Sequence, residues 1–195
     1  MFCIAKCERV LIQQNDGADI WNRSWAEYKN GFGDPSGNYW AGNDQISALT
    51  ANGRKLTFEL QSLRNEKLWY NANYTGFRVL TEAYNFKLEV DKKLKRRAGN
   101  TTDGFSYLNG YMFSTYDRDH DKGSTNCAGY KGSGWWYRGF EGWCISLGVN
   151  RPTRDDFFHR PSFGWYGLTG VRSMRKSMLK TSRMWLECDE WWWWR

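Results

Sequence analysis

The sequence predicts an α+β fold, in which an antiparallel sheet carries a few short helices and a long irregular half. Two helix signals near the start are followed by segments in which apolar and polar residues alternate, which is the order expected of an α+β domain. The chain of 195 residues contains 13 Trp and 20 Gly but only 3 Pro. This composition favours loops packed on aromatic side chains over a helical bundle.

Both helices are predicted from their start and stop signals. Ser24 and Glu27 have the spacing of a capping box, and Gly31 follows as a helix stop, so a helix is predicted between Ser24 and Gly31. A second short helix is predicted to begin at Asn43 and to end before the turn signal at 52–53.

Four segments are predicted as strands. A short apolar run at 9–13 ends at a turn signal, and apolar and polar residues alternate at 56–60 and at 86–90. The segment 68–80 carries aromatic and β-branched residues and is predicted as further strand. Successive strands with short connections favour an antiparallel meander.

The second half of the chain, from Gly99 to about Gly170, lacks this periodicity. Glycine, polar turn residues and aromatic residues dominate it. A segment of this length without regular elements is normally disordered or is held by ligands and crosslinks. Its aromatic content argues against disorder, so we expect a bound ligand or a disulfide to hold it.

Basic residues give the chain a formal net charge of +7 and gather at 91–97 (DKKLKRR) and between Arg172 and Arg183. Either cluster could contact a polyanion such as heparin, nucleic acid or an acidic membrane surface. No nucleic-acid fold signature accompanies them, so we expect no specific nucleic-acid partner. Solvated basic segments are the simpler interpretation.

Neither a membrane span nor a secretory signal is predicted. The chain has no apolar run of the length of a transmembrane helix, and its start lacks the charged and apolar regions of a signal peptide. Five cysteines leave at least one unpaired if disulfides form, so their number leaves the compartment open. Glycosylation sequons begin at Asn22, Asn73 and Asn100 and matter only in a secreted chain.

An enzyme is not predicted. The two histidines are His120, inside an acidic stretch, and His159, and the sequence pairs neither of them with a nucleophile. Nothing places the acidic pair Asp155-Asp156 in a cleft. A binding function is therefore expected.

The stretch 114–127, STYDRDHDKGSTNC, is acidic at its centre although the chain is basic. Asp117, Asp119 and Asp121 alternate within it, and alternate aspartates in an irregular loop can converge on Ca²⁺, which prefers oxygen ligands. An EF-hand is excluded, because its glycine and its final glutamate are missing at the required positions. The alternative is a solvated turn that neighbouring cations neutralise: Arg118, His120 and Lys122.

Five blocks of the sequence resemble, in order, the fibrinogen C-terminal domain, the family of fibrinogen chains, ficolins, tenascins and angiopoietins. The blocks are NRSWAEYKNGFG at 22–33, GNYWAGNDQISALT at 37–50, YTGFRV at 74–79, FSYLNGYMFSTYDRDHDK at 105–122 and NCAGYKGSGWWY at 126–137. The resemblance extends over about 9–137, and SMRKSMLK at 173–180 is similar to the closing strand of the family.

The resemblance implies a secreted, extracellular recognition domain with a central twisted sheet and a distal half that holds calcium and ligand. It divides one domain at 1–183 into a sheet and helix part at 1–98, a loop-rich part at 99–170 and a closing strand at 171–183. The chain begins inside the usual domain of the family, so we expect a fragment, a truncated gene model or a deliberately altered sequence.

The remaining residues, 184–195, form a tail with four adjacent tryptophans that matches nothing in the family. An exposed apolar segment of this kind indicates an interface or an aggregation-prone site. Together with Cys188, it could join copies of the chain in a homo-oligomer.

The resemblance also implies the residues of a calcium site. In the family, two aspartates and two backbone carbonyls that follow them bind Ca²⁺. Here they correspond to Asp119, Asp121 and the carbonyls of Gly123 and Thr125, with Asp117 in the outer shell. The ion would order the glycine-rich loops.

A disulfide between Cys127 and Cys144 is a further implication of the resemblance. RGFEGW at 138–143 adds residues to the spacing that the family has between these cysteines. Two reduced, buried thiols are the alternative, and a cytosolic location would require them.

The ligand pocket of the family lies beside this disulfide. Its sugar-binding members use a tyrosine after the first cysteine, a histidine directly after the second and a tryptophan near the end. Here Lys131 takes the tyrosine position next to Tyr130, Ile145 takes the histidine position, and Trp165 matches the tryptophan. Core packing is the alternative for Trp165 and for the aromatic residues at 135–137.

Together these features predict a calcium-binding, lectin-like domain that binds acetylated or acidic glycans. The first alternative is a receptor- or matrix-binding module of the angiopoietin and tenascin type, which contacts an extracellular protein through its distal loops. The second is polyanion binding through 91–97, which needs no pocket.

Overall fold

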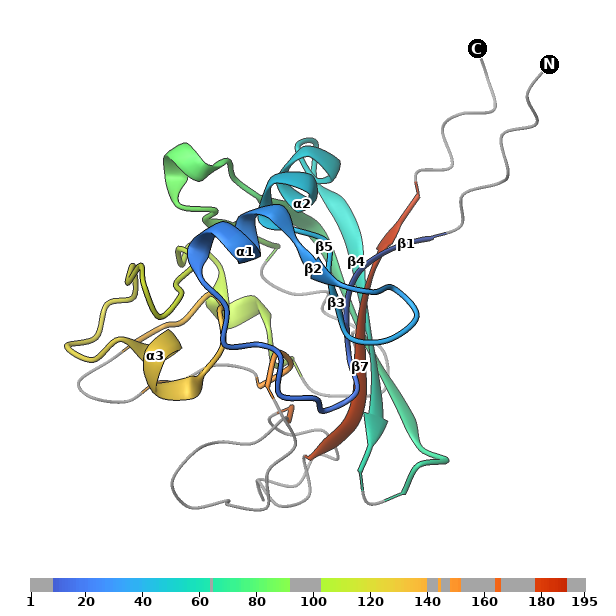
Figure 1. Ribbon diagram of the computed structural model, residues 1–195. Coiled ribbons are helices and arrows are strands. Elements are labelled where there is room, and N and C mark those ends of the chain that lie inside the picture. The colour runs from blue at the N-terminus through green and yellow to red at the C-terminus, as the bar shows by residue number, and fades with distance from the viewer. Residues whose placement is uncertain are drawn as a thin grey trace, which may run out of the picture.

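The computed structural model describes residues 9–63, 65–91, 103–139, 144, 148–151, 164–165 and 178–188. A seven-stranded antiparallel sheet runs through these residues, and the helices and long loops lie on one side of it (Figure 1). The α+β fold that the sequence predicts is confirmed.

Short helices and longer strands make up the described chain. The strands are β1 (Arg9–Asn15), β2 (Phe32–Gly33), β3 (Tyr39–Trp40), β4 (Arg54–Ser62), β5 (Trp69–Val79), β6 (Leu88–Glu89) and β7 (Leu179–Glu187), in the spatial order β2-β3-β1-β7-β4-β5-β6. The helices are α1 (Trp25–Asn30), α2 (Asn43–Leu49) and α3 (Cys127–Lys131), with 3-10 turns η1 (Glu82–Tyr84) and η2 (Ser106–Leu108).

Capping contacts at α1 confirm the predicted capping box. The Ser24 hydroxyl accepts a hydrogen bond from the Glu27 backbone N–H, and a Glu27 carboxylate oxygen accepts one from the Ser24 backbone N–H at 2.8 Å. These bonds satisfy N–H groups that have no partner within the first turn. The helix ends where Gly31 adopts a φ of +93°, which glycine tolerates and most residues do not.

The last strand, β7, lies in the middle of the sheet. It pairs with β1 on one side and β4 on the other, so that Leu186 lies opposite both Val10 and Leu56. The sequence predicts a meander, in which each strand pairs with the next along the chain. The sheet differs from it, because the last strand lies between β1 and β4. β7 also continues beyond Arg183, where the sequence places the end of the closing strand, because Leu186 is a further buried side chain.

β6 is shorter than the alternation at 86–90 predicts. Only Leu88 and Glu89 form a strand, because Asn85 and Phe86 have positive φ values of 51° and 48° and cannot be extended. The Phe86 side chain is nevertheless fully buried. The alternation thus indicates the burial of these side chains correctly, but not the backbone conformation.

An aromatic cluster joins the irregular half of the chain to the sheet. Phe113 lies at its centre, with ring centroids 5.2 Å from Tyr28 on α1, 6.0 Å from Trp40 on β3 and 5.2 Å from Trp136. Trp136 also donates a hydrogen bond to the Phe86 carbonyl at 2.7 Å. Aromatic pairs of this kind stabilise a fold by about 0.5–1.5 kcal/mol each beyond the burial of their area. Packed rings therefore replace regular elements in this half.

Gly134 packs directly against this cluster, and its substitution tests the packing. A Cβ at Gly134 would lie 2.6 Å from Cε2 of the buried Tyr28 ring. We expect Gly134→Ala to lower the free energy of unfolding by about 1–3 kcal/mol through overpacking, measured by urea denaturation. Gly37→Ala is the matched control, because nothing lies within 4 Å of its Cβ. Equal stability of the two variants would contradict the packing.

Candidate functional site

The acidic stretch forms a loop that runs from the bridge between Thr115 and Arg118 to the start of α3. Asp119 and Asp121, the acidic pair, lie next to each other, and the Asp121 backbone N–H donates to Asp119 Oδ1 at 3.1 Å. Burial raises the pKa of Asp121, and the neighbouring Asp119 carboxylate also raises it, while two backbone donors oppose the shift. The loop thus holds two negative groups close together.

Asp121 organises the loop through both of its carboxylate oxygens. Oδ1 accepts a hydrogen bond from the Gly123 N–H at 2.6 Å, and Oδ2 accepts one from the N–H of Cys127, the first residue of α3, at 2.9 Å. A Cβ on Gly123 would lie 3.0 Å from Asp121 Oδ1 and 3.5 Å from the Thr125 carbonyl oxygen. The structure therefore brings the four residues of the expected calcium site into one turn: Asp119, Asp121, Gly123 and Thr125.

Gly139 is a residue of this site that sequence reasoning missed. Its φ is +36°, and its backbone lies so close to the loop that a Cβ would be 2.2 Å from Asp121 Oδ1 and 2.5 Å from the Gly123 nitrogen. A side chain at this position would push the loop apart. The sequence contains 20 glycines, and nothing in it distinguishes Gly139 from the others.

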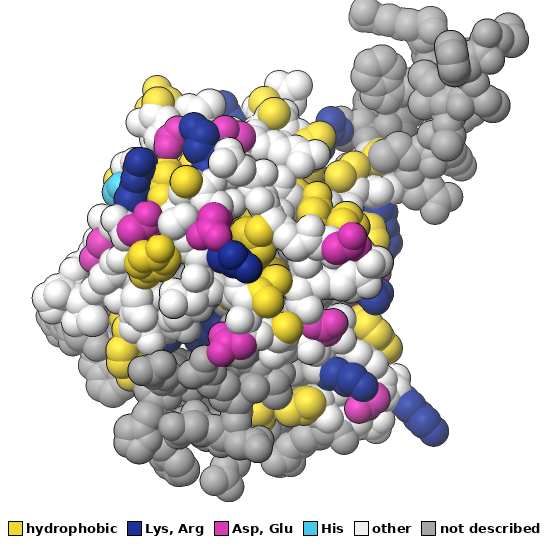
Figure 2. Space-filling model, in the orientation of Figure 1, with side chains coloured by type: hydrophobic (Ala, Val, Ile, Leu, Met, Phe, Trp, Pro, Cys, Tyr) yellow, Lys and Arg dark blue, Asp and Glu magenta, His cyan; other side chains and the backbone are white. Residues whose placement is uncertain are grey.

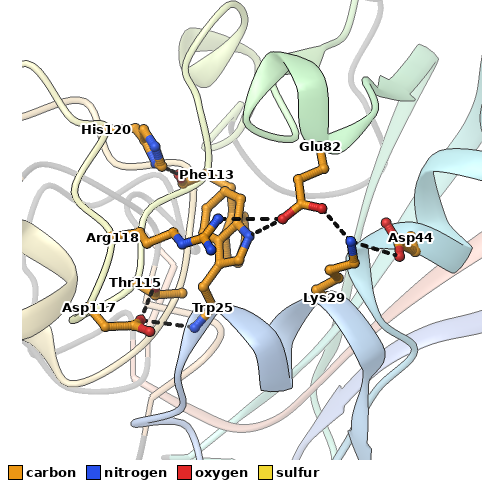
Figure 3. Close-up of polar contacts among 9 residues, drawn as sticks. All are labelled: Trp25, Lys29, Asp44, Glu82, Phe113, Thr115, Asp117, Arg118 and His120. Atoms are coloured by element: carbon orange, nitrogen blue, oxygen red, sulfur yellow. Dashed lines mark hydrogen bonds and ion pairs between the residues drawn. The ribbon is translucent and has the colours of Figure 1, made fainter.

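Asp117 points towards α1 (Figure 3). Its Oδ1 accepts hydrogen bonds from the Trp25 backbone N–H at 2.9 Å and from the Thr115 hydroxyl at 2.7 Å. Because Trp25 is the first residue of α1, Asp117 caps this helix together with Ser24. The resemblance implies an outer-shell role at the metal for Asp117, whereas its contacts in the structure attach the acidic loop to α1.

Arg118 belongs to a polar network centred on Glu82 of η1 (Figure 3). One Glu82 oxygen accepts a hydrogen bond from Trp25 Nε1 at 2.7 Å and pairs with Arg118 at 3.4 Å, and the other oxygen pairs with Lys29 of α1. Lys29 first, and then Trp25, hold the pKa of Glu82 below its ordinary value. Arg118 also lies over the Trp25 ring, 5.1 Å from its centroid. Its charge therefore acts at α1 and η1.

His120 and Lys122 likewise make their contacts away from the acidic pair. His120 Nδ1 lies 2.9 Å from the Phe113 carbonyl oxygen, and the Lys122 ammonium lies 5.2 Å from the centroid of the Tyr111 ring. Within the described part of the chain, no cation forms an ion pair with the acidic pair. The same residues contain no group of three His, Cys, Asp or Glu side chains that could hold a metal. Local neutralisation, the alternative left open by the sequence, is not seen.

Cys127 and Cys144 form the disulfide that the resemblance implies, with Cα atoms 5.3 Å apart and a sequence separation of 17. A crosslink that closes a loop of this length stabilises a fold by about 3 kcal/mol through the entropy of the unfolded chain. Since Cys127 also donates its N–H to Asp121, the disulfide and the acidic pair hold the same end of α3. Cys188 is disulfide-bonded as well.

α3 presents two of the expected ligand residues side by side. Tyr130 is 48% exposed, and the Lys131 ammonium lies 4.9 Å from the centroid of its ring. Trp165 is placed elsewhere: it is fully buried, and its ring lies 4.9 Å from that of Phe58 on β4. Core packing thus accounts for Trp165, and equally for 135–137, whose side chains are all buried.

Comparison with known proteins identifies the family. The sequence profile of "Fibrinogen beta and gamma chains, C-terminal globular domain" matches residues 5–181. The chain belongs to this family. The fibrinogen-like globe domain of human ANGPTL2 has 32% sequence identity and a TM-score of 0.75 to this fibrinogen C-terminal domain, covering 92% of this chain and 79% of that one.

Two curated relatives match this chain over part of their own length. Angiopoietin-related protein 2 of Homo sapiens is 40% identical over 129 residues, which are 66% of this chain and 25% of the relative. Ficolin-3 of Homo sapiens is 35% identical over 129 residues, which are 66% of this chain and 42% of the relative. The matched segment thus spans less than half the length of either relative.

The basic clusters of this fibrinogen C-terminal domain are described only in part. Residues 92–97 and 172–177 lie outside the described residues, as does Ile145. Other members of the second cluster form ion pairs: Lys180 with Glu66 at 2.5 Å and Arg183 with Glu59 at 3.9 Å. Figure 2 shows positive and negative side chains intermixed on the face in view. In the described chain, no helix has the length and apolarity needed to cross a membrane.

The attachment of the acidic loop to α1 can be tested at Asp117. Asp117→Ala removes two hydrogen bonds, one of them a helix cap, so we expect it to lower the free energy of unfolding by about 1–2 kcal/mol in calcium-free buffer. Urea denaturation measures the change. Asp16→Ala is the control, because Asp16 is exposed and its side chain forms no hydrogen bond in the described structure. A loss no greater than that of the control would show that Asp117 does not hold the loop.

Proposed function

We propose that this fibrinogen C-terminal domain is a calcium-dependent, lectin-like recognition domain that acts outside the cell and binds acetylated or acidic glycans. The observation that carries the proposal is the acidic pair: two adjacent carboxylates, one of them partly buried, that no cation of the described residues neutralises. Like charges held together in this way favour a bound cation, because the cation removes their repulsion.

The donors in the acidic loop suit Ca²⁺. The carboxylates of the acidic pair and the carbonyl oxygens of Gly123 and Thr125 are hard oxygen ligands, and Ca²⁺ takes about six to eight such ligands with water among them. Both Asp121 oxygens already accept N–H bonds, but each keeps a second lone pair that can bind a metal. These residues are therefore the ones that would hold the ion.

Calcium would support recognition through α3. Asp121 accepts the Cys127 N–H at the start of this helix, and Tyr130 and Lys131 lie at its other end. An acidic loop ordered by the ion would fix the position of the helix, and with it the two side chains that a ligand meets. The role of the ion is structural first.

An extracellular binding module fits the remaining chemistry of the site. The Cys127–Cys144 disulfide is of a kind that persists in oxidising compartments and is rare in the cytosol. His120 contacts the Phe113 carbonyl through Nδ1, and Asp121 of the acidic pair accepts a hydrogen bond that stabilises the loop, so these groups already have structural roles. We therefore propose binding and no catalysis.

A receptor- or matrix-binding module is the second candidate, and the exposed aromatic side chains favour it. Tyr116 is 49% exposed and Tyr130 is 48% exposed, and tyrosine is enriched at protein interfaces. The similarity to angiopoietin-related protein 2 fits this candidate as well as the similarity to ficolin-3 fits the first. Polyanion binding depends on 91–97, of which 92–97 lie outside the described residues.

Calcium should stabilise the folded chain if the site exists. At a calcium concentration 100-fold above Kd, ligand linkage adds about 2.7 kcal/mol of stability, which should raise Tm and be reversed by a chelator. Asp119→Asn and Asp121→Asn should lose this rise, whereas the control Asp16→Asn should keep it. An unchanged Tm of the natural chain on addition of calcium would reject the metal site.

Binding assays separate the candidate functions. A lectin should bind a glycan array, and both a chelator and Asp119→Asn should abolish this binding. A receptor-binding module should instead bind a cell-surface protein in the presence of free N-acetyl sugars. Retention on heparin that disappears at moderate salt and ignores the chelator would favour the polyanion interpretation.

A further inference from the structure

Lys131, the last residue of α3, is a half-buried cation. Its ammonium lies over the ring of Tyr130, 4.9 Å from the centroid, in a cation–π contact. Gly132 follows in the left-handed conformation, with a φ of +66°, and ends the helix. The helix end therefore determines where this charge lies.

No carboxylate of the described residues neutralises this charge. Lys131 forms no ion pair in that part of the chain, and the charged group that acts on it is the guanidinium of Arg151, which is only 2% exposed. Burial first, and Arg151 second, lower the pKa of Lys131 to about 7. A partly dehydrated ammonium next to a second cation is a position that a bound anion would stabilise.

Arg151, the cation that acts on Lys131, also acts on the Tyr107 phenol. Arg151 and Arg138 both act on Tyr107, a phenol whose pKa burial raises to about 12. Asp103 also acts on Tyr107, but its Oδ1 accepts hydrogen bonds from the backbone N–H groups of Phe105 and Ser106 and from the Tyr74 hydroxyl. The Asp103 carboxylate is thus already engaged by neighbouring donors.

An aromatic surface lies beside the charge. Tyr116 and Tyr130 are 49% and 48% exposed, and a Cβ on Gly129, between them, would lie 4.0 Å from Tyr116 Cβ. Aromatic rings bind the apolar face of a ligand, while a few placed polar groups orient it. A sugar ring that carries a carboxylate offers both features in one unit.

We propose that Tyr130 and Lys131 select a carboxylate-bearing sugar, so that the domain binds acidic glycans in preference to neutral ones. The inference rests on the proposed glycan-binding function and adds to it the class of ligand. The ring of Tyr130 would pack against the sugar, and the Lys131 ammonium would pair with its carboxylate.

The preference should weaken as the pH rises. With a folded-state pKa of about 7 for Lys131, the ammonium form dominates at pH 6 and the neutral amine at pH 8. The carboxylate of the sugar stays ionised over this range. Affinity for the acidic sugar should therefore be nearly full at pH 6 and fall about ten-fold between pH 6 and pH 8.

Calorimetry with the full chain in saturating calcium tests this. The probes are sialyllactose and its methyl ester, which is the same sugar without the charge. The natural chain should bind the acid about ten-fold more tightly than the ester at pH 6 and lose most of this preference at pH 8. Lys131→Met should lose the preference at pH 6, and Lys131→Arg, which stays charged, should keep it at pH 8.

Several outcomes would overturn the inference. They are equal affinity for the acid and the ester, a preference that survives in Lys131→Met, tighter binding to a polyglutamate peptide than to sialyllactose, and no binding to either sugar. If the acid and the ester bind equally and a chelator abolishes the binding of both, the result supports the calcium-dependent lectin function and rejects the preference for a carboxylate. If neither sugar binds, the result also rejects the glycan-binding function.

Discussion

The acidic pair imposes the constraint on which the loop before α3 depends. Asp121 is partly buried and lies next to Asp119, yet its two oxygens organise the Gly123 turn and the start of α3. A carboxylate in this position orders the backbone and leaves a negative charge that the described residues do not balance. Burying such a charge is costly unless it is paired, and a hard cation bound by oxygen ligands is the simplest partner.

Contacts that need no ion attach the same loop to the rest of the fold. Asp117 caps α1, and Arg118 joins Trp25 to Glu82 of η1 (Figure 3). Phe113, directly before the loop, packs among the rings of the sheet and helix half. The loop is thus fixed at its beginning by packing and hydrogen bonds. Its end depends on the acidic pair and the disulfide, which is where a cation would add most.

Short sequence patterns predict those elements of the structure that contacts between nearby residues stabilise. The capping box of Ser24 and Glu27 predicts α1 because both partners lie within one turn, and alternation predicts β4 because a strand places alternate side chains on one face. The central place of β7 has no such signal, since its pairing joins distant segments of the chain. Asp117 and Gly139 show the same limit at the site, because each acts on a group beyond its own turn.

α3 connects the proposed calcium site to the proposed ligand residues. Five residues are too few for a helix to be stable by itself, so α3 takes its position from its attachments. These are the Asn126 cap, whose amide also donates to the Thr115 and Tyr116 carbonyls, the Asp121 carboxylate and the disulfide. All of them lie at its first turn, on the side of the acidic loop. The residues at its other end are therefore positioned in part by that loop, and in the function proposed above a bound cation would act on affinity for ligand by way of the helix.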